Sequence, residues 1–449
     1  MRRRFLTGGT AVFAAAAVLL SGCGASAEQN AGDREAAAVP AADLPADDFE
    51  GWNALLEENT ISADFQRSLS EFAFESSSTV LSAEEENAVF SPLSLYYALA
   101  VLGSGASGET GQEILDTLGA EDREALADQC GKLFRNYVYT EERQRVMGET
   151  YEGEAPDSAV RLANSLWISE ELSLDPSYQE LCGEEFYASS YSVDFADGTA
   201  GERMGQWIAK QTKGVLEPRP ALDPETMLAI LNTLFFYGGW QDAFSENMTE
   251  EEVFTREDSS EVEVPFMNRT ESMANYIRGD GYTMAGLSTN HNCRMLFVLP
   301  EEGVELQSLL EDPETLKNIF ADQEQEWKSG EIIWKVPKFS FGSSLDLKQP
   351  LETLGIQSMF DSTSADFSDI SEDPLAVDQV IQEAHIGVDE EGVEGAAYTM
   401  IALSGSAAED EEPETIQMFL NRPFLFAIYD SGRDVWLFLG VCRDPSVES

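Results

Sequence analysis

The chain has 449 residues and a formal net charge of −56, because it contains 83 Asp and Glu residues but only 27 Lys and Arg residues. This balance excludes nucleic acid as a natural partner, since binding to phosphates needs basic patches. With 43% hydrophobic residues the chain can bury a large core. A prior of about 150 residues per domain suggests two or three domains. Yet no Pro-, Ser- or Gly-rich linker interrupts residues 50–446.

The N-terminus carries a targeting pattern. Three arginines precede an apolar run from Ala11 to Leu20 and then a small-residue stretch that ends at Cys23. This order is typical of a bacterial lipoprotein signal, so we predict removal of residues 1–22 and lipidation of Cys23. A secretory signal with an incidental cysteine is the alternative. The run is shorter than the roughly 20 apolar residues of a membrane-spanning helix.

The next segment, residues 24–48, is rich in Ala, Asp, Glu and Pro and has almost no aromatic residue. This composition is typical of a flexible tether. The predicted organisation is therefore a signal peptide (1–22), a lipidated cysteine with an acidic tether (23–48) and one folded domain (49–446). Such a protein would lie on the outer face of a bacterial membrane and touch it only through the lipid.

Several segments then predict helices and strands in turn. Ser91 and Pro92 are well suited to begin a helix, because a serine hydroxyl caps free backbone N–H groups. Residues 91–102 predict this capped helix, and residues 163–168 are a strand candidate. Residues 207–214 and 231–240 are interpreted as a helix and as a strand with an aromatic end only through the resemblance described below.

Residues 384–401 combine strand alternation with small side chains. Ala384, Ile386 and Val388 alternate with polar residues or glycine, as in a strand with one buried face. The alternation continues with small or uncharged residues on one face: Val393, Gly395, Ala397, Thr399 and Ile401. The stretch 403–408 and the acidic run 409–412 that follow predict exposed loop. Taken alone, an ordinary Gly- and Ala-rich surface loop would explain the pattern equally well.

These segments and three later ones (337–339, 365–368 and 421–424) together resemble the serpin family, in family order, from about Phe49 to Asp444. The resemblance implies one large α+β domain, the serpin fold, with large mixed and antiparallel β-sheets surrounded by helices and an exposed reactive-centre loop. No single segment decides the family, but the ordered set does.

The resemblance also assigns roles to residues. The implied hinge of the reactive loop comprises Glu390, Gly392, Val393, Glu394, Gly395, Ala396, Ala397 and Thr399. Family spacing from Glu390 makes Ser406-Ala407 the reactive-site bond, although the loop length also allows cleavage between Leu403 and Glu409. A buried polar cluster is implied at Ser91, Ser94, Asn232 and Gln382, where glutamine replaces the family's histidine. Trp240 marks the aromatic end of a central strand.

The implied function is inhibition of a serine-type endopeptidase by a suicide-substrate mechanism. The protease would cleave the loop, form a covalent acyl complex and be trapped when the loop inserts into a β-sheet. Small residues around the bond suit elastase-like or subtilisin-like enzymes, and we expect a monomer. The alternatives are a non-inhibitory serpin that acts as a binding protein and, from another class, a solute-binding lipoprotein.

The sequence predicts no catalytic residues, so we expect that the chain is not an enzyme. It contains two histidines, His291 and His385, and neither accompanies a nucleophile motif. Its remaining four cysteines are widely separated and form no metal-ligand spacing: Cys130, Cys182, Cys293 and Cys442. We therefore expect no metal and no cofactor. Four cysteines outside the cytoplasm could still pair, but Cys293 and Cys442 lie within apolar strand-like runs typical of buried residues, so we expect no disulfide.

Overall fold

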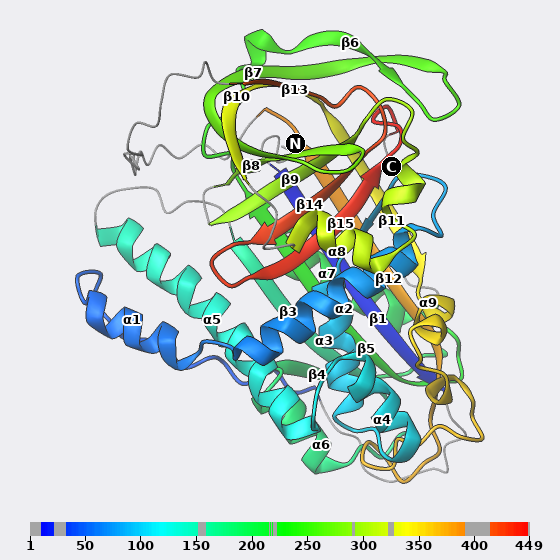
Figure 1. Cartoon of the computed structure of the whole chain (residues 1–449). Coiled ribbons are helices and arrows are strands. Elements are labelled where there is room, and N and C mark those ends of the chain that lie inside the picture. Colours follow the sequence, from blue (N-terminus) through cyan, green and yellow to red (C-terminus); the bar gives the residue numbers. More distant parts are fainter. Residues whose placement is uncertain are drawn as a thin grey trace, which may run out of the picture.

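A computed structural model of the chain describes residues 10–21, 33–150, 159–214, 216, 218, 222–289, 292–321, 327–390 and 414–447. Two β-sheets cross in the middle of the molecule, and helices pack around them (Figure 1). This architecture confirms the predicted α+β class.

The described helices lie mostly in the first half of the chain. The α-helices are α1 (Phe49–Glu58), α2 (Ala63–Leu81), α3 (Pro92–Gly103), α4 (Gly108–Thr117), α5 (Arg123–Thr150), α6 (Pro176–Glu184), α7 (Thr199–Gln211), α8 (Pro313–Ala321) and α9 (Lys348–Thr353). Short 3-10 turns are η1 (Glu246–Met248), η2 (Leu306–Leu309) and η3 (Ser358–Phe360).

The first sheet has six strands, in the order β11-β12-β1-β5-β3-β4. Their bounds are β11 (Phe339–Asp346), β12 (Ala376–Val388), β1 (Thr10–Ser21), β5 (Thr226–Gly238), β3 (Ala159–Ser169) and β4 (Ala188–Val193). All neighbours are antiparallel except β3 and β4. The N-terminal apolar run therefore forms a central strand of this sheet, seen in blue between β12 and β5 in Figure 1.

The second sheet has nine strands, in the order β13-β10-β7-β8-β9-β14-β15-β2, with β6 paired to β7. Their bounds are β2 (Ala88–Phe90), β6 (Glu250–Thr255), β7 (Glu261–Arg278), β8 (Tyr282–Ser288), β9 (Cys293–Pro300), β10 (Lys328–Pro337), β13 (Thr415–Phe419), β14 (Phe424–Asp430) and β15 (Val435–Cys442). In the described residues, the β10 and β13 pair alone is parallel.

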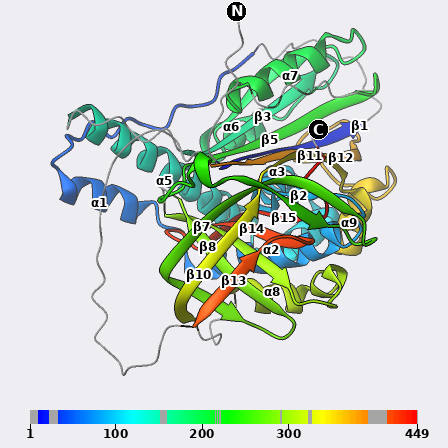
Figure 2. The same ribbon diagram turned by 90° about the horizontal axis from the view of Figure 1, so that it is seen from above.

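Helix α3 is the centre of the core. All twelve of its residues are buried, as expected for a helix that is apolar around its whole circumference. Its start follows the sequence prediction, because the Ser91 hydroxyl accepts from the Ser94 N–H and Pro92 occupies the first turn. Seen from above, α3 lies between the two sheets, with α7 on the outer side of the six-stranded sheet (Figure 2).

The alternation predicted before the hinge is confirmed. In β12, Ala384, Ile386 and Val388 are buried, whereas His385 and Gly387 between them are half-buried. The predicted strand at 163–168, the helix from 207 and the strand from 231 are also present, in β3, α7 and β5. The strand at 163–168 was a candidate from the sequence, whereas the helix from 207 and the strand from 231 were implied by the family resemblance.

Candidate functional site

The candidate site is the position between β5 and β12, which β1 occupies; we call it the slot. From Ala11 to Ser21, β1 pairs with β12 on one side and with β5 on the other. It is antiparallel to both, and Leu20 near its end is fully buried. A strand of twelve residues can thus complete the middle of the sheet.

A network of buried amides and hydroxyls lies beside the slot; we call it the polar cluster. The structure brings together the four residues that the resemblance singled out. Gln382 of β12 accepts from the Ser91 N–H at 2.7 Å and donates to the Ser91 carbonyl at 2.9 Å. The Ser94 hydroxyl donates to Asn232 Oδ1 at 2.5 Å. These contacts connect β12, across the start of α3, to β5.

Asn164 is a fifth member of this cluster that sequence reasoning did not identify. Its Oδ1 accepts from Asn232 Nδ2 at 2.7 Å, and its own Nδ2 donates to the Phe186 carbonyl at 2.7 Å. Asn164 lies opposite Asn232 in the pairing of β3 and β5. An asparagine in a largely apolar strand was the available signal, because a buried amide needs partners.

The polar cluster contains no ionisable group, and all five side chains are buried. Hydrogen bonds of this kind are strong in a low-dielectric interior, and an unpaired member costs about 1–3 kcal/mol. The cluster therefore joins the two sides of the slot in a way that does not depend on pH.

The end of the slot next to the predicted hinge is held by charged and aromatic groups; we call it the hinge clasp. Lys338 Nζ lies 2.6 Å from Glu390 Oε2, and the Thr249 hydroxyl donates to Glu390 Oε1 at 2.6 Å. The Trp240 indole donates to the Asp389 carbonyl at 2.9 Å. These contacts fix the last described residues before the predicted loop.

The electrostatics of the clasp favour the ionised carboxylate. Burial works to raise the pKa of Glu390, which is 6% exposed, but hydrogen bonds from Lys338 and Thr249 outweigh burial and lower that pKa. Lys338 lies in the segment 337–339, to which the sequence assigned no role, and no sequence signal pointed to Thr249. No local pattern could have paired these residues with Glu390, because 52 and 141 positions separate them from it.

The chain is also held at Glu414, which lies after the predicted loop and directly before β13. Arg278 Nη2 lies 2.7 Å from Glu414 Oε1, and the Tyr276 hydroxyl donates to Oε2 at 2.6 Å. The Glu414 carbonyl accepts from the Glu331 N–H at 2.9 Å. Both ends of the predicted loop are thus attached to residues in the β-strands or next to them.

Several predicted site residues lie outside the described part of the chain. They are the lipidation site Cys23, the histidine His291, the hinge residues Gly392, Val393, Glu394, Gly395, Ala396, Ala397 and Thr399, and the reactive-site pair Ser406 and Ala407. Their roles remain predictions.

Within the described ranges, no group of three or more metal-ligating side chains occurs, and no helix is both long and apolar enough to cross a membrane. Burial lowers the pKa of His385, whose ring nitrogen lies 3.2 Å from the Ser340 hydroxyl. The four described cysteines are buried free thiols, and burial raises the pKa of each: Cys130, Cys182, Cys293 and Cys442.

Known proteins are similar to this chain in both sequence and fold. Serpin-Z1C of Triticum aestivum is 30% identical over 418 residues, which cover 87% of this chain and 99% of the wheat protein. Alpha-1-antiproteinase S of Cavia porcellus is also 30% identical, over 86% of this chain and 91% of its own.

Among solved structures, the native state of the thermophilic serpin Tengpin superposes with a TM-score of 0.70 at 22% identity, over 86% of this chain and 95% of its own. Mouse protein Z-dependent protease inhibitor gives a TM-score of 0.68 at 25% identity, over 89% of this chain and 100% of its own. The family model described as "Serpin (serine protease inhibitor)" matches residues 67–445. On the evidence of that match and of these relatives, the chain belongs to the serpin family.

Proposed function

We propose that this chain is a suicide-substrate inhibitor of serine endopeptidases, attached by a lipid on Cys23 to the outer face of a bacterial membrane. Serpins are in general protease inhibitors rather than enzymes. The proposal adds a mechanism, a class of target and a location to that family assignment.

The observation that carries the proposal is the six-stranded sheet with its complete central strand. The chain leaves β12 at Val388, beside the end of β5. If it turned back after Glu390 into the slot, it would run antiparallel to β12, which is the direction that β1 takes. The sheet can therefore accommodate an inserted loop in both length and direction.

The chemistry implied by the family needs no catalytic group from this chain. The protease serine attacks the carbonyl carbon of Ser406, the bond to the Ala407 nitrogen breaks, and the protease histidine transfers the serine proton to the leaving amine. Ser406 is then esterified to the protease. Insertion of the upstream loop would draw the attached protease away and distort it before water can release it.

The composition of the hinge supports insertion. Val393 and Gly395 stand where serpins often have threonine or serine and alanine, yet both are small enough to be buried between β5 and β12. Gly395 costs about 0.5–1 kcal/mol of ordering entropy relative to alanine. The small residues from Gly405 to Ala408 favour an elastase-like or subtilisin-like target over a trypsin-like one.

The test is incubation of the mature chain, residues 23–449, with elastase, subtilisin and trypsin, followed by denaturing electrophoresis. We expect a covalent complex with elastase or subtilisin, and a released C-terminal peptide that begins near Ala407 by mass spectrometry. Cleavage without a complex would instead favour a non-inhibitory binding protein. A thermal shift caused by a small solute, with no cleavage in the loop, would favour a solute-binding lipoprotein.

Two matched variants test the hinge assignment. Gly395→Arg should convert the inhibitor into a substrate, because insertion would bury an unpaired charge at a cost of several kcal/mol. Glu394→Arg should have a smaller effect, since that side chain is predicted to face outward. Equal loss of the complex in both variants would contradict the predicted alternation.

A further inference from the structure

We propose that the segment before the domain is a docked arm that orients the inhibitor on its membrane, with the reactive loop directed away from the lipid. The inference rests on the lipid attachment at Cys23 in the proposed function. It concerns residues 33–59, the described end of the predicted tether together with α1, which we call the N-terminal arm. Sequence composition predicted a flexible tether as far as residue 48, but the described part of that segment contacts the domain.

The first contact of the arm extends the six-stranded sheet. Arg34 pairs with Ser190 at the outer edge of β4 through two backbone hydrogen bonds of 2.7 Å. The Ser192 N–H donates to Asp33 Oδ1 at 3.2 Å. The other oxygen of Asp33 lies 3.0 Å from Arg203 Nη2 of α7. The arm thus joins both a strand edge and the helix that covers this sheet.

The second contact is at the other end of the arm, where α1 packs on α5. Trp52 is fully buried, and its indole donates to the Pro45 carbonyl at 3.1 Å. Asn136 of α5 donates to the carbonyls of Leu56 and Asn59, each at 3.2 Å, at the end of α1. The arm is therefore held at two separate places.

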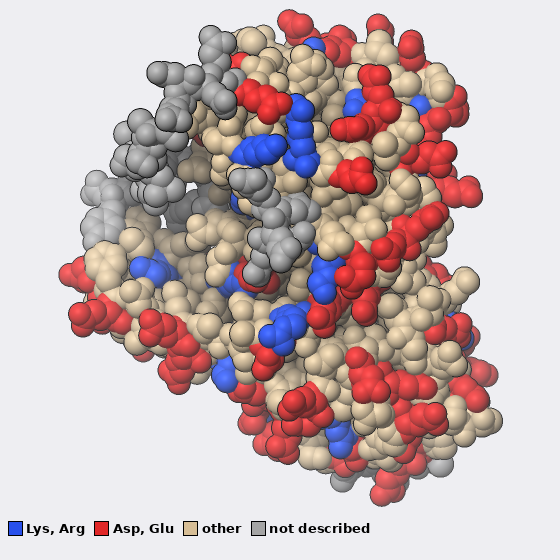
Figure 3. All heavy atoms as spheres, in the orientation of Figure 1, with Lys and Arg blue, Asp and Glu red and all other residues tan. Residues whose placement is uncertain are grey.

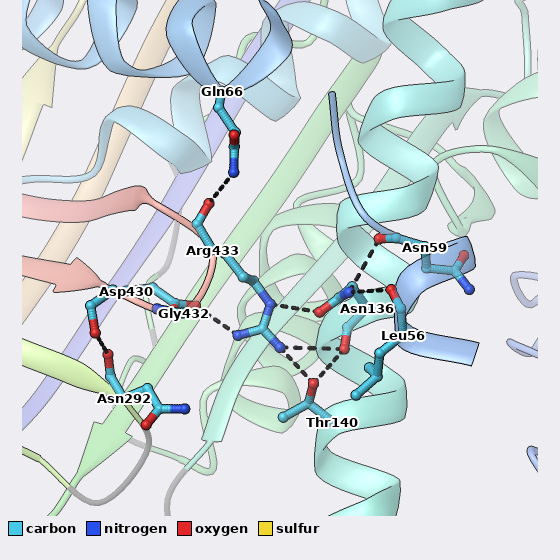
Figure 4. Close-up of polar contacts among 10 residues, drawn as sticks. Leu56, Asn59, Gln66, Asn136, Thr140, Asn292, Asp430, Gly432 and Arg433 are labelled. Atoms are coloured by element: carbon cyan, nitrogen blue, oxygen red, sulfur yellow. Dashed lines mark hydrogen bonds and ion pairs between the residues drawn. The ribbon is translucent and has the colours of Figure 1, made fainter. Parts of the chain in front are cut away.

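A buried ion pair positions Asn136 for this role (Figure 4). Arg433 donates to Asn136 Oδ1 at 2.8 Å and pairs with the fully buried Asp430 at 2.8 Å. Burial alone would lower the pKa of Arg433, but the charge of Asp430 raises it overall. The carboxamide of Asn136 is thereby oriented with its nitrogen toward α1. The turn between β14 and β15 thus supports the attachment of the arm.

Docking of the arm shortens the reach of the lipid anchor. Nine residues, 24–32, separate Cys23 from Asp33. Ten chain steps span at most about 35 Å, whereas a tether that remained free as far as Phe49 would span about 90 Å. A docked arm therefore keeps one particular edge of the domain near the membrane.

The arm meets β4 near one end of the sheet's strands, and the predicted loop leaves β12 at the opposite end. Ser192 is level with Ile168 and, across β3, with Leu228 of β5. Gly238, ten residues further along β5, lies at the end where β12 approaches Glu390. Ten strand residues span about 34 Å. The anchor and the loop thus leave the domain at opposite ends of one sheet.

The negative charge of the domain acts against contact between its other faces and anionic lipid. Asp and Glu side chains are spread over the face shown in Figure 3, with few Lys and Arg among them. The arm, α7 and the turn before α7 add acidic residues at the anchored edge itself: Asp33, Glu35, Asp197 and Glu202. Like charges repel, so the domain should stand away from such a membrane, within the reach of its anchor.

The experiment measures which end of the full lipidated protein lies nearer the lipid. Donor dyes are placed in separate proteins on Glu180→Cys of α6, close to β4, and on Met273→Cys, which is 84% exposed in β7. The four described native thiols are buried and should label slowly. Energy transfer is then measured to an acceptor lipid in vesicles of phosphatidylcholine and phosphatidylglycerol.

We expect at least two-fold greater energy transfer from position 180 than from position 273. Arg34→Pro removes the N–H that donates to Ser190, so this ratio should fall toward one. Glu35→Pro is the matched control, because no backbone bond of its N–H to β4 occurs in the described chain. Its ratio should stay that of the parent.

Equal transfer in the parent protein, or an unchanged ratio in Arg34→Pro, would overturn the proposal. So would a chain that mass spectrometry finds without lipid. Inhibition is measured separately, by formation of the covalent complex with elastase or subtilisin in detergent. Loss of the complex with the ratio intact would contradict the proposed function and leave the orientation standing.

Discussion

The middle of the slot and its hinge-side end are held by different chemistry. In the middle, hydroxyls and amides of Ser91, Ser94, Asn232 and Gln382 satisfy one another within a fully buried environment. At the hinge end, Glu390 is held by Lys338, whose side chain is 37% exposed. A buried neutral network is costly to disturb, whereas an ion pair with one partly exposed partner is weaker and depends on pH. The contrast suggests a firm centre and an end that can be released.

The largest effect should come from filling the slot itself. A chain that retains residues 1–22 has β1 between β5 and β12, so its loop has no position to enter. We expect at least ten-fold less covalent complex from the full chain than from residues 23–449. Electrophoresis after incubation with elastase or subtilisin measures the difference.

A variant within residues 1–22 provides the control. Ala15 pairs with Thr233 on one side and with Glu383 on the other, so Ala15→Pro removes a backbone donor in the middle of β1. This variant should restore part of the complex. Full inhibition by the unmodified long chain would show that β1 does not obstruct the loop.

The second effect tests the middle of the slot. Asn232→Leu keeps a similar volume but leaves the Ser94 hydroxyl and the Asn164 amide without this partner. With about 1–3 kcal/mol for each unsatisfied group, we expect the free energy of unfolding to fall by about 3 kcal/mol. Denaturant unfolding of the mature chain gives the value. A loss below about 1 kcal/mol would mean that the cluster is not a firm connection.

The third effect tests the hinge clasp and should be smaller. Lys338→Met leaves the Glu390 carboxylate without its cation, and the exposure of Lys338 limits the loss of unfolding free energy to about 1 kcal/mol. The double variant with Glu390→Gln should lose little more than either single variant. A double-mutant cycle measures this coupling, and strictly additive losses would show that the ion pair contributes nothing.

The smallest effect concerns pH. Because the folded state lowers the pKa of Glu390, the resulting stabilisation is present above the unfolded value of about 4.3 and is lost as pH falls through the folded pKa. The stability difference between the parent and Glu390→Gln should therefore shrink between neutral pH and pH 3. Thermal unfolding of both proteins across this range measures it. A constant difference would assign the effect of Glu390 to packing instead of charge.

The sequence alone was sufficient to predict individual elements and the fold class. Alternation at Ala384, Ile386 and Val388 predicted the inner face of β12, and Ser91 with Pro92 predicted the start of α3. These patterns succeed because burial on one face and helix capping are local consequences of neighbouring residues. The family followed from the order of such segments, and with it the four polar residues that meet beside the slot.

The tertiary structure alone decided which distant residues meet. It placed the apolar run of the N-terminus in the slot, brought Lys338 and Thr249 to Glu390, and docked Asp33 and Arg34 on β4. An apolar run and a polar, aromatic-poor segment carry no local sign of their partners. Strand pairing and ion pairing depend on which groups the folded chain brings within a few ångströms, and sequence neighbours do not specify that.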